Sequence, residues 1–271
     1  MVEIKNTLDI FKLLPKTNCR KCNAPTCLAF AAAVFQGQRQ ISDCPFVDSA
    51  ICQDTHVAKA PFAAREEDMY EKLDQLKAKV IQLDLVQRAA VLGGRFSNNR
   101  LILKILGKKF AVDQNGRLIT DIHVNPWITI PVFDYLLNAK GVTPTGKWGS
   151  LRELKGGQAW YKFFAHRCET PLKKVADRYT DLFYDMVHIF DGKQVEKHYD
   201  ADISIVLSPL PKVPILVCYL KPEDGLESDL NLFFDETVEE NLSIQSIYTI
   251  GAGLANMFEK IAQRHGIAIL K

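Results

Sequence analysis

The sequence has 271 residues, 47% of them hydrophobic, and carries 34 basic against 32 acidic residues. This length allows one sizeable core, or a main domain with a small appendage. The near balance of charge gives no support for binding to nucleic acid or to a membrane surface. The N-terminal stretch alternates apolar residues with Lys, Glu and Asp, unlike a signal peptide, and the longest uncharged apolar run is far short of the ~20 residues of a spanning helix. We therefore expect a cytoplasmic protein without a membrane span.

Residues 1–56 form a cysteine-rich segment that holds five of the seven cysteines of the chain. Four of them follow the pattern Cys19-x2-Cys22-x4-Cys27-x16-Cys44. A secreted disulfide framework would spread its cysteines over the whole domain and would come with a signal peptide. Clustered cysteines in a reducing compartment instead indicate metal ligands.

The unequal spacing of these cysteines favours an iron–sulfur cluster over zinc. Structural zinc usually takes two C-x2-C pairs, whereas iron–sulfur motifs use unequal loops and a distant fourth ligand, which here is followed by Pro45. Thr26 is a candidate N-cap for a helix that begins at Cys27, where the positive helix end favours a thiolate. A zinc site and a set of unliganded thiols are the alternatives. Lys16, Arg20 and Lys21 would partly offset the negative charge of a cluster.

The rest of the chain alternates blocks of helices and blocks of strands. Residues 57–92 are predicted as a linker and one long helix from about Arg65 to Leu92. Short strands follow over 100–124, with turns at Gly107-Lys108 and Asn115-Gly116. The later predictions are a helix at 126–141, two helices at 158–190 broken near Thr170-Pro171, strands within 201–235, and a last helix from about Ser243 to His265.

This order of elements predicts an α+β fold. We expect a small helical [4Fe–4S] module over residues 1–56 and a larger domain over 93–271, with a mainly antiparallel sheet and packed helices.

Several other motifs carry weaker signals. Cys52 could substitute as a cluster ligand, but a buried or idle thiol is the favoured interpretation. Cys168 and Cys218 are expected in the core, and His166 beside Cys168 is only a weak candidate for a reactive pair.

Two glycine-containing segments resemble nucleotide-binding loops only by letter. The stretch GVTPTGKW at 141–148 lacks the Ser/Thr of a phosphate loop and follows a predicted helix instead of a strand. The wider region 141–160 could be a lid, although a loop with aromatic anchors is the favoured interpretation. Gly-Ala-Gly at 251–253 is expected to serve helix packing.

The stretch LPKTNCRKCNAPTCLAFAAAVFQGQRQISDCP resembles the small iron–sulfur domain of the corrinoid iron–sulfur protein large subunit. It is also similar to the cluster domain in the B-type subunit of Rnf electron-transport complexes. The resemblance implies that Cys19, Cys22, Cys27 and Cys44 bind one [4Fe–4S] cluster. Those domains often have Gly where this chain has Arg20 and Asn23. Asn tolerates a left-handed backbone, but Arg does so less readily.

The stretch LSPLPKVPILVCYLKPEDGLESDLNLFFDETVEENLSIQSIYTIGAGLANMF is similar to an uncharacterised family of domains of unknown function found behind such cluster modules in anaerobes. This second resemblance implies no activity.

Two functions of different classes are consistent with the sequence. In the favoured one, the cluster relays single electrons to a protein partner such as a ferredoxin or flavodoxin, or to a ligand of the larger domain. In the alternative, the larger domain is an enzyme or binds a corrinoid or other tetrapyrrole, with the cluster as its reductant. A structural or sensing cluster is a third option, and the sequence leaves open whether the protein is an enzyme.

Overall fold

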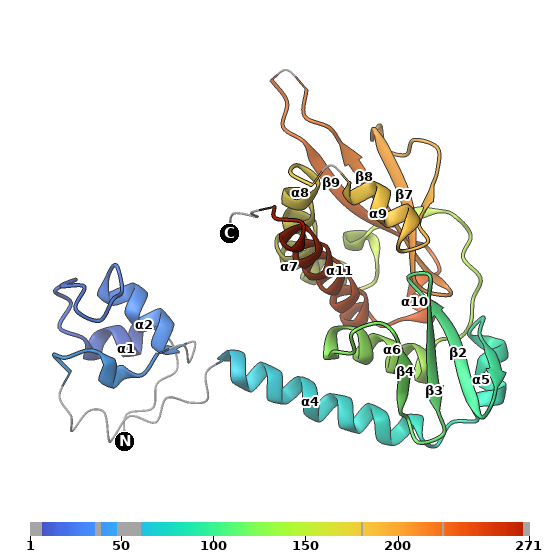
Figure 1. Cartoon of the computed structure of the whole chain (residues 1–271), viewed down its shortest axis with the longest axis horizontal. Coiled ribbons are helices and arrows are strands. Elements are labelled where there is room, and N and C mark those ends of the chain that lie inside the picture. The colour runs from blue at the N-terminus through green and yellow to red at the C-terminus, as the bar shows by residue number, and fades with distance from the viewer. Residues whose placement is uncertain (1–6, 36–38, 48–60, 180, 224, 268–271) are drawn as a thin grey trace. The chain divides into compact units, whose positions relative to one another are not determined.

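The computed structural model describes residues 7–35, 39–47, 61–179, 181–223 and 225–267. The chain divides into two compact units, residues 1–72 and 73–271, which are drawn in Figure 1. Each unit is described by itself below, as the small unit and the large unit. In the described part of the chain, no helix combines the length and the apolar character that a bilayer crossing requires.

The small unit is built from short helices around its own core. Helix α1 (Thr7–Leu13) packs against α2 (Cys27–Phe35), and the single turn η1 (Ile41–Asp43) follows. Helix α2 begins where the sequence predicts, because the Thr26 hydroxyl accepts the backbone N–H of Ala29 at 3.0 Å. The buried side chains of this core are Ile10, Leu14, Cys22, Ala24, Cys27, Phe30, Ala31, Val34, Ile41 and Cys44.

The predicted single helix from Arg65 to Leu92 is two helices in the structure. Helix α4 (Pro61–Val80) ends eight residues after the boundary between the units, and α5 (Leu85–Val91) begins after four intervening residues. Asp84 separates them, because its carboxylate accepts the N–H groups of Val86 and Gln87 and so caps a new helix. The prediction of a continuous helix is wrong in this respect.

The first sheet of the large unit is an antiparallel meander in the order β1-β2-β3-β4. Its strands are β1 (Arg95–Ser97), β2 (Arg100–Ile105), β3 (Lys108–Asp113) and β4 (Leu118–Thr120). Leu106 and Gly107 join β2 to β3 with φ of 46° and 75°, the double left-handed conformation of a tight hairpin turn. The predicted turn thus lies one residue earlier than expected.

The second sheet has five antiparallel strands in the order β5-β9-β8-β7-β6. Its strands are β5 (Trp148–Ser150), β6 (Lys193–Gln194), β7 (Ile203–Leu210), β8 (Val213–Leu220) and β9 (Asp229–Asp235). The three long strands lie within the predicted range of 201–235. The two sheets are joined where the Leu106 N–H donates to the Ser208 carbonyl at 3.0 Å. The predicted α+β class with mainly antiparallel sheets is confirmed.

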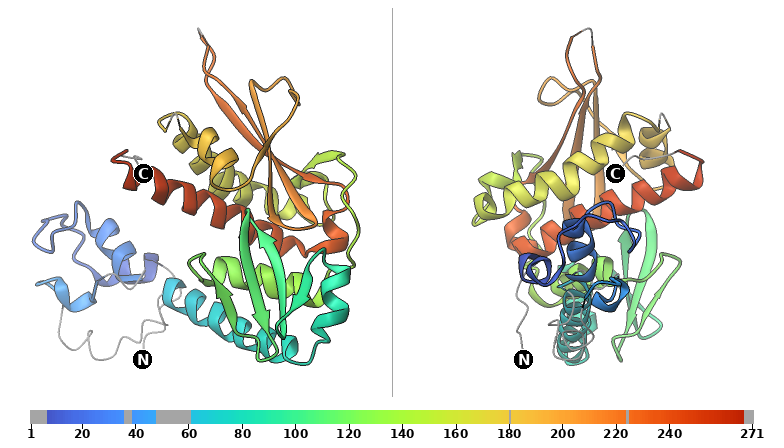
Figure 2. Two further views of the ribbon diagram at one scale, coloured as in Figure 1. Left: turned by 45° about the vertical axis from the view of Figure 1, so that its right-hand side comes forward. Right: turned by 90° about the vertical axis from the view of Figure 1, so that its left-hand side faces the viewer.

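Further helical segments follow in the large unit, and the last of them packs against four of the others (Figure 2). They are α6 (Pro126–Asn138), η2 (Leu151–Glu153), α7 (Gly157–Phe164), η3 (Ala165–Glu169), α8 (Thr170–Ala176), α9 (Leu182–His188), α10 (Val238–Asn241) and α11 (Ile244–Arg264). Ser243 caps α11 and His265 ends it, so this helix was predicted to the residue.

The predicted helix break near Pro171 is wrong. Segment η3 is π-helical, and its wider turn lets the Thr170 N–H reach the Ala165 carbonyl. Pro171 then stands in the first turn of α8, where a missing N–H is tolerated. The helical run instead ends at Ala176, and the next helix begins at Leu182.

Candidate metal centre

The structure describes six of the seven cysteines, and four of these six lie in the small unit. Cys22, Cys27 and Cys44 are buried in one shared core, whereas Cys19 is exposed on the loop between α1 and α2. Cys27 is the first residue of α2, and Cys44 directly follows η1. Cys52, the candidate substitute ligand, lies outside the described residues.

The cysteine loop between α1 and α2 has an unusual backbone. Lys16, Asn18, Arg20 and Asn23 all have positive φ, of 58°, 49°, 59° and 53°. Left-handed backbone costs an L-residue roughly 1–2 kcal/mol, and Gly and Asn adopt it most readily. Arg20 and Asn23, the two positions where similar domains often have glycine, thus take the conformation that glycine favours.

Asn18 connects this loop to the start of α2. Its side-chain carbonyl accepts the backbone N–H of Cys27 at 2.8 Å, and its own backbone N–H points at Cys27 Sγ at 3.4 Å. The side chain and the backbone of Asn18 thus both contact Cys27 and hold the loop against the first turn of α2. The sequence analysis missed Asn18, although an Asn directly before the first cysteine of the loop was a visible signal for left-handed backbone.

Two further groups support the loop. Arg39 donates from its guanidinium to the carbonyl of Cys22 and, at 3.5 Å, to that of Asn23, so it links the loop to the segment before η1. The backbone N–H of Lys21 and, second, the side chain of Thr17 lower the pKa of the Cys19 thiol. Arg39 also escaped the sequence analysis, because its contacts reach 16 and 17 positions back along the chain.

The surface of the cysteine loop is cationic. Lys12, Lys16, Arg20 and Lys21 are all exposed. Lys12 forms an ion pair with Asp9 at 3.1 Å, and Lys21 lies over the ring of Phe46 at 5.0 Å from its centroid.

The four thiols supply a donor set of sulfur only, which suits soft metals and iron–sulfur clusters. Within the described ranges, no three Cys, His, Asp or Glu side chains form a group that could hold one metal ion. The four cysteines are thus a set of thiols in one small unit, three of them in its core.

The other cysteines of the large unit are core residues, as predicted. Cys168 is fully buried in η3, and burial strongly raises the pKa of its thiol, while His166 is exposed. Their different exposure gives no support to a reactive pair. Cys218 is buried on β8, and its sulfur lies 3.8 Å from the Ser204 hydroxyl.

The segment 141–148 follows helix α6, which is not the context of a phosphate loop. The Asp235 carboxylate accepts the N–H groups of Thr145 and Gly146 at 3.2 and 2.6 Å. These amides therefore already bind an anionic group. Trp148 pairs with β9 in the sheet, and the Trp160 ring lies 5.3 Å from that of Tyr248. Aromatic anchors of this kind agree with the favoured interpretation of the region 141–160.

Comparison with protein families gives two matches. Residues 84–257 match the family described as "Domain of unknown function (DUF3786)", and residues 14–46 match the family described as "Putative Fe-S cluster". The second range includes Cys19, Cys22, Cys27 and Cys44. These matches support an iron–sulfur protein.

Curated relatives match over the N-terminal region. The chain is 43% identical over 58 residues to the corrinoid/iron-sulfur protein large subunit of Moorella thermoacetica, which covers 21% of this chain and 13% of that protein. It is 46% identical over 44 residues to the acetyl-CoA decarbonylase/synthase complex subunit gamma of Methanocaldococcus jannaschii, covering 16% and 9%. The chain thus spans only a small part of the length of these relatives. No solved structure gives a significant match.

Proposed function

Since the chain belongs to the family described as domain of unknown function (DUF3786) and carries an iron–sulfur segment before that domain, we propose that it is a one-electron carrier. One [4Fe–4S] cluster is held by Cys19, Cys22, Cys27 and Cys44. The observation that carries the proposal is the set of four thiols in one small unit, at a spacing typical of cubane ligands.

A zinc ion gathers all its ligands around one centre, whereas each thiolate of a cubane binds a different iron. The thiolates around a cubane are therefore spread more widely than those around zinc, which suits cysteines on three separate segments. These segments are the loop, the start of α2 and the end of η1. When bound, the cluster supplies one-electron redox chemistry. With four thiolates it leaves no iron open to a substrate, which favours electron transfer over catalysis.

The residues around the cysteines have separate tasks in this proposal. The N–H of Asn18 and the N-terminus of α2 stabilise negative charge on Cys27. Arg39 holds the backbone of Cys22 in place. The core around Cys22, Cys27 and Cys44 excludes water from three ligands, and Cys19 brings the fourth close to the surface, where a partner can approach.

A protein partner is supported by charge and by the names of the relatives. Acetyl-CoA decarbonylase/synthase subunits are, by name, parts of a complex. The exposed Lys16, Arg20 and Lys21 form a positive rim that complements an acidic carrier such as a ferredoxin or flavodoxin. Because carriers of this kind are cytoplasmic proteins, we propose that the protein acts in the cytoplasm. A ligand bound by the large unit is the second candidate acceptor, because that unit contains a pocket of about 430 Å³.

The experiment is stopped-flow reduction of the anaerobically purified protein by a reduced ferredoxin across a salt series. Charge reversal by Arg20→Glu with Lys21→Glu should lower the second-order rate at low ionic strength about threefold to tenfold and flatten its salt dependence. The matched control is Lys108→Glu with Lys109→Glu, two exposed cations on β3 that change the net charge equally.

The visible spectrum of the cluster should be the same in all variants. Equal rates for the two charge reversals, or a rate indifferent to salt, would exclude this surface as the docking site. A cluster that no ferredoxin or flavodoxin reduces would reject the carrier function itself.

A further inference from the structure

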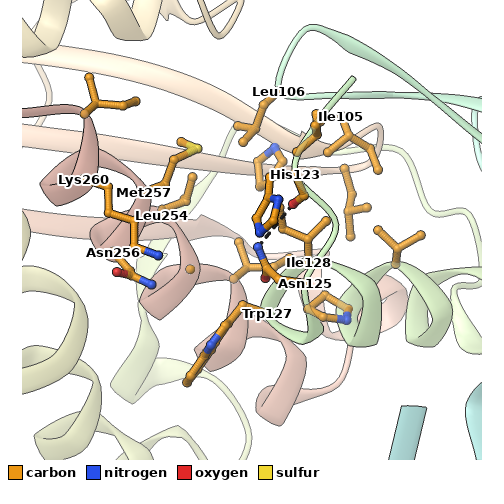
Figure 3. Close-up of a pocket in the computed structure, with 18 of the residues that line it drawn as sticks. Ile105, Leu106, His123, Asn125, Trp127, Ile128, Leu254, Asn256, Met257 and Lys260 are labelled. Atoms are coloured by element: carbon orange, nitrogen blue, oxygen red, sulfur yellow. Dashed lines mark hydrogen bonds between the residues drawn. The ribbon is translucent and has the colours of Figure 1, made fainter. Parts of the chain in front are cut away.

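The large unit contains an apolar pocket of about 430 Å³ with a cationic opening. Figure 3 shows its walls, which come from the β2–β3 turn, the start of α6 and one face of α11. Leu106, Trp127 and Leu254 belong to the apolar lining, and the exposed Lys260 and Arg264 of α11 line the pocket as well. Across the described residues, neither cation takes part in an ion pair and none of the lining side chains is acidic. The pocket therefore suits an apolar group that has negative charge beside it.

The tip of the β8–β9 hairpin has the complementary character. The N–H groups of Glu223 and Leu226 each donate to the carbonyl of the other residue, at 3.3 and 2.9 Å, and this bridge closes the hairpin. Leu226 is 66% exposed there, the largest fraction of any large apolar residue that the structure describes. Residues 223–229 carry four carboxylates and no cation. The hairpin thus presents one leucine between negative charges.

The tip of a chain does not reach the pocket of the same chain. The β8–β9 hairpin projects beyond the helices of the large unit and points away from α6, which forms part of the pocket wall (Figure 1, Figure 2). Burial of an exposed leucine is favourable, and opposite charges around an apolar contact select the partner and its orientation. A second copy of this chain supplies an occupant that meets both requirements.

From these features we propose that the protein associates with itself, with the Leu226 side chain of one copy in the pocket of another. Glu223 and Glu227 of the tip then face Lys260 and Arg264 at the opening. The contact joins two different surfaces, and every copy offers both of them. A small ligand in the pocket would compete with this contact. The proposal does not depend on the cluster, because both surfaces belong to residues 73–271.

Analytical ultracentrifugation of the full-length, anaerobically purified protein tests this association. The weight-average mass should rise with concentration above the 30.6 kDa of one chain. The series should extend to high protein concentration, because small interfaces are weak. Leu226→Ser should weaken the association at least about tenfold, since the buried leucine is its apolar centre. The matched control is Phe163→Ser, a 65% exposed residue outside both surfaces, which should leave the association unchanged.

Two charge reversals identify the surfaces that meet. Glu223→Lys with Glu227→Lys, and separately Lys260→Glu with Arg264→Glu, should each weaken the association at least about tenfold by opposing like charges. An equimolar mixture of the two variants should associate again, because each tip then meets a pocket of opposite charge on the other variant. The control is Lys162→Glu with Lys193→Glu, two exposed cations outside the tip and the pocket lining.

A mass of one chain at every concentration would overturn the proposal, and the natural protein alone decides this point. Association that a folded Leu226→Ser protein keeps in full would also overturn it. The same holds for a mixture of the two charge-reversed variants that associates no better than each variant alone. Thermal melting checks that the variants are folded.

Discussion

Gly251 and Gly253 stand two residues apart in α11 but have different surroundings. A Cβ added at Gly251 would lie 2.5 Å from the ring of Phe164 and 3.2 Å from Cys168 Sγ, closer than side chains tolerate. A Cβ added at Gly253 would meet the nearest atom of Trp127 at 3.5 Å, which is ordinary contact. Gly251 thus permits the helices to approach, in agreement with the predicted packing role, whereas Gly253 is free to change.

We predict opposite effects of alanine at these two positions. Gly251→Ala should destabilise the large unit by about 1–3 kcal/mol through overpacking. Gly253→Ala should stabilise it by about 0.5–1 kcal/mol, because alanine is the better helix former. All three tryptophans, at 127, 148 and 160, belong to the large unit, so chemical unfolding followed by their fluorescence reports on it. Equal destabilisation by both changes would show that the close contact at Gly251 is not the cause.

Single residues differ in how far the sequence reveals them. The cysteine spacing pointed to a candidate metal centre because ligands of one site recur at short, characteristic intervals. The supporting contacts of Asn18 and Arg39 depend on how a left-handed loop folds back, which no periodic pattern encodes.

At the scale of elements, the π-helical segment η3 attaches the helices to the second sheet. Strand β5 pairs only with residues 233–235 of β9, and the N–H of Leu232 next to them donates to the buried Glu169 carboxylate at 3.1 Å. Burial, more than any other influence, raises the pKa of Glu169 to about 7. The carboxyl therefore gains a proton more readily in the folded than in the unfolded chain.

The raised pKa of Glu169 predicts a pH-dependent stability. Because the folded pKa exceeds the unfolded value, the favourable contribution is complete at low pH and is lost as pH rises from about 4.5 through about 7. Glu169→Gln keeps an acceptor for Leu232 but cannot ionise. Its free energy of unfolding, relative to the natural protein, should rise by up to about 3 kcal/mol between pH 5 and pH 8.

Tryptophan fluorescence in a denaturant series at both pH values measures this difference. The control variant is the exposed Glu196→Gln, which removes the same charge from the surface. A pH dependence that is identical in the natural and Glu169→Gln proteins would show that this carboxyl does not titrate between the two values.

The elements with strong periodic patterns were predicted well, and those decided by local hydrogen bonds were not. The apolar strands β7 to β9 and the amphipathic α11 follow from their sequences, as does the α+β class. The cap at Asp84 interrupts a run that looks helical throughout, and the π-helical η3 continues directly into α8, whose Pro171 reads as a break. In both cases a few side-chain or backbone bonds outweigh the pattern.

At the scale of the whole molecule, the two units have separate apolar cores that share no residue. The core of the small unit contains three cysteines among ten buried side chains, so bound metal should supply much of its stability. The core of the large unit begins with Leu73, Leu76 and Val80 of α4 and needs no cysteine of the small unit. The separate module at 1–56 stays a prediction, which the following experiment tests.

A fragment of residues 61–271 should therefore fold without iron. We expect a soluble protein with a cooperative unfolding transition and a midpoint within a few degrees of that of the large unit in the full chain. Circular dichroism during heating measures this. A fragment starting at residue 85, which lacks α4, is the comparison and should melt at a lower temperature because Val80 and its neighbours are lost. Aggregation of the longer fragment, or a melt without a transition, would mean that the units depend on each other.

The central claim is that Cys19, Cys22, Cys27 and Cys44 hold one [4Fe–4S] cluster. Iron and acid-labile sulfide, measured on anaerobically purified protein, test it most directly. We predict about four of each per chain, since a cubane contains four iron and four sulfide ions. Each single Cys→Ala change at the four positions should strip or damage the cluster, whereas Cys168→Ala and Cys218→Ala should leave it nearly intact. Stoichiometric zinc without sulfide, or a cluster that survives Cys44→Ala but not Cys52→Ala, would contradict the account.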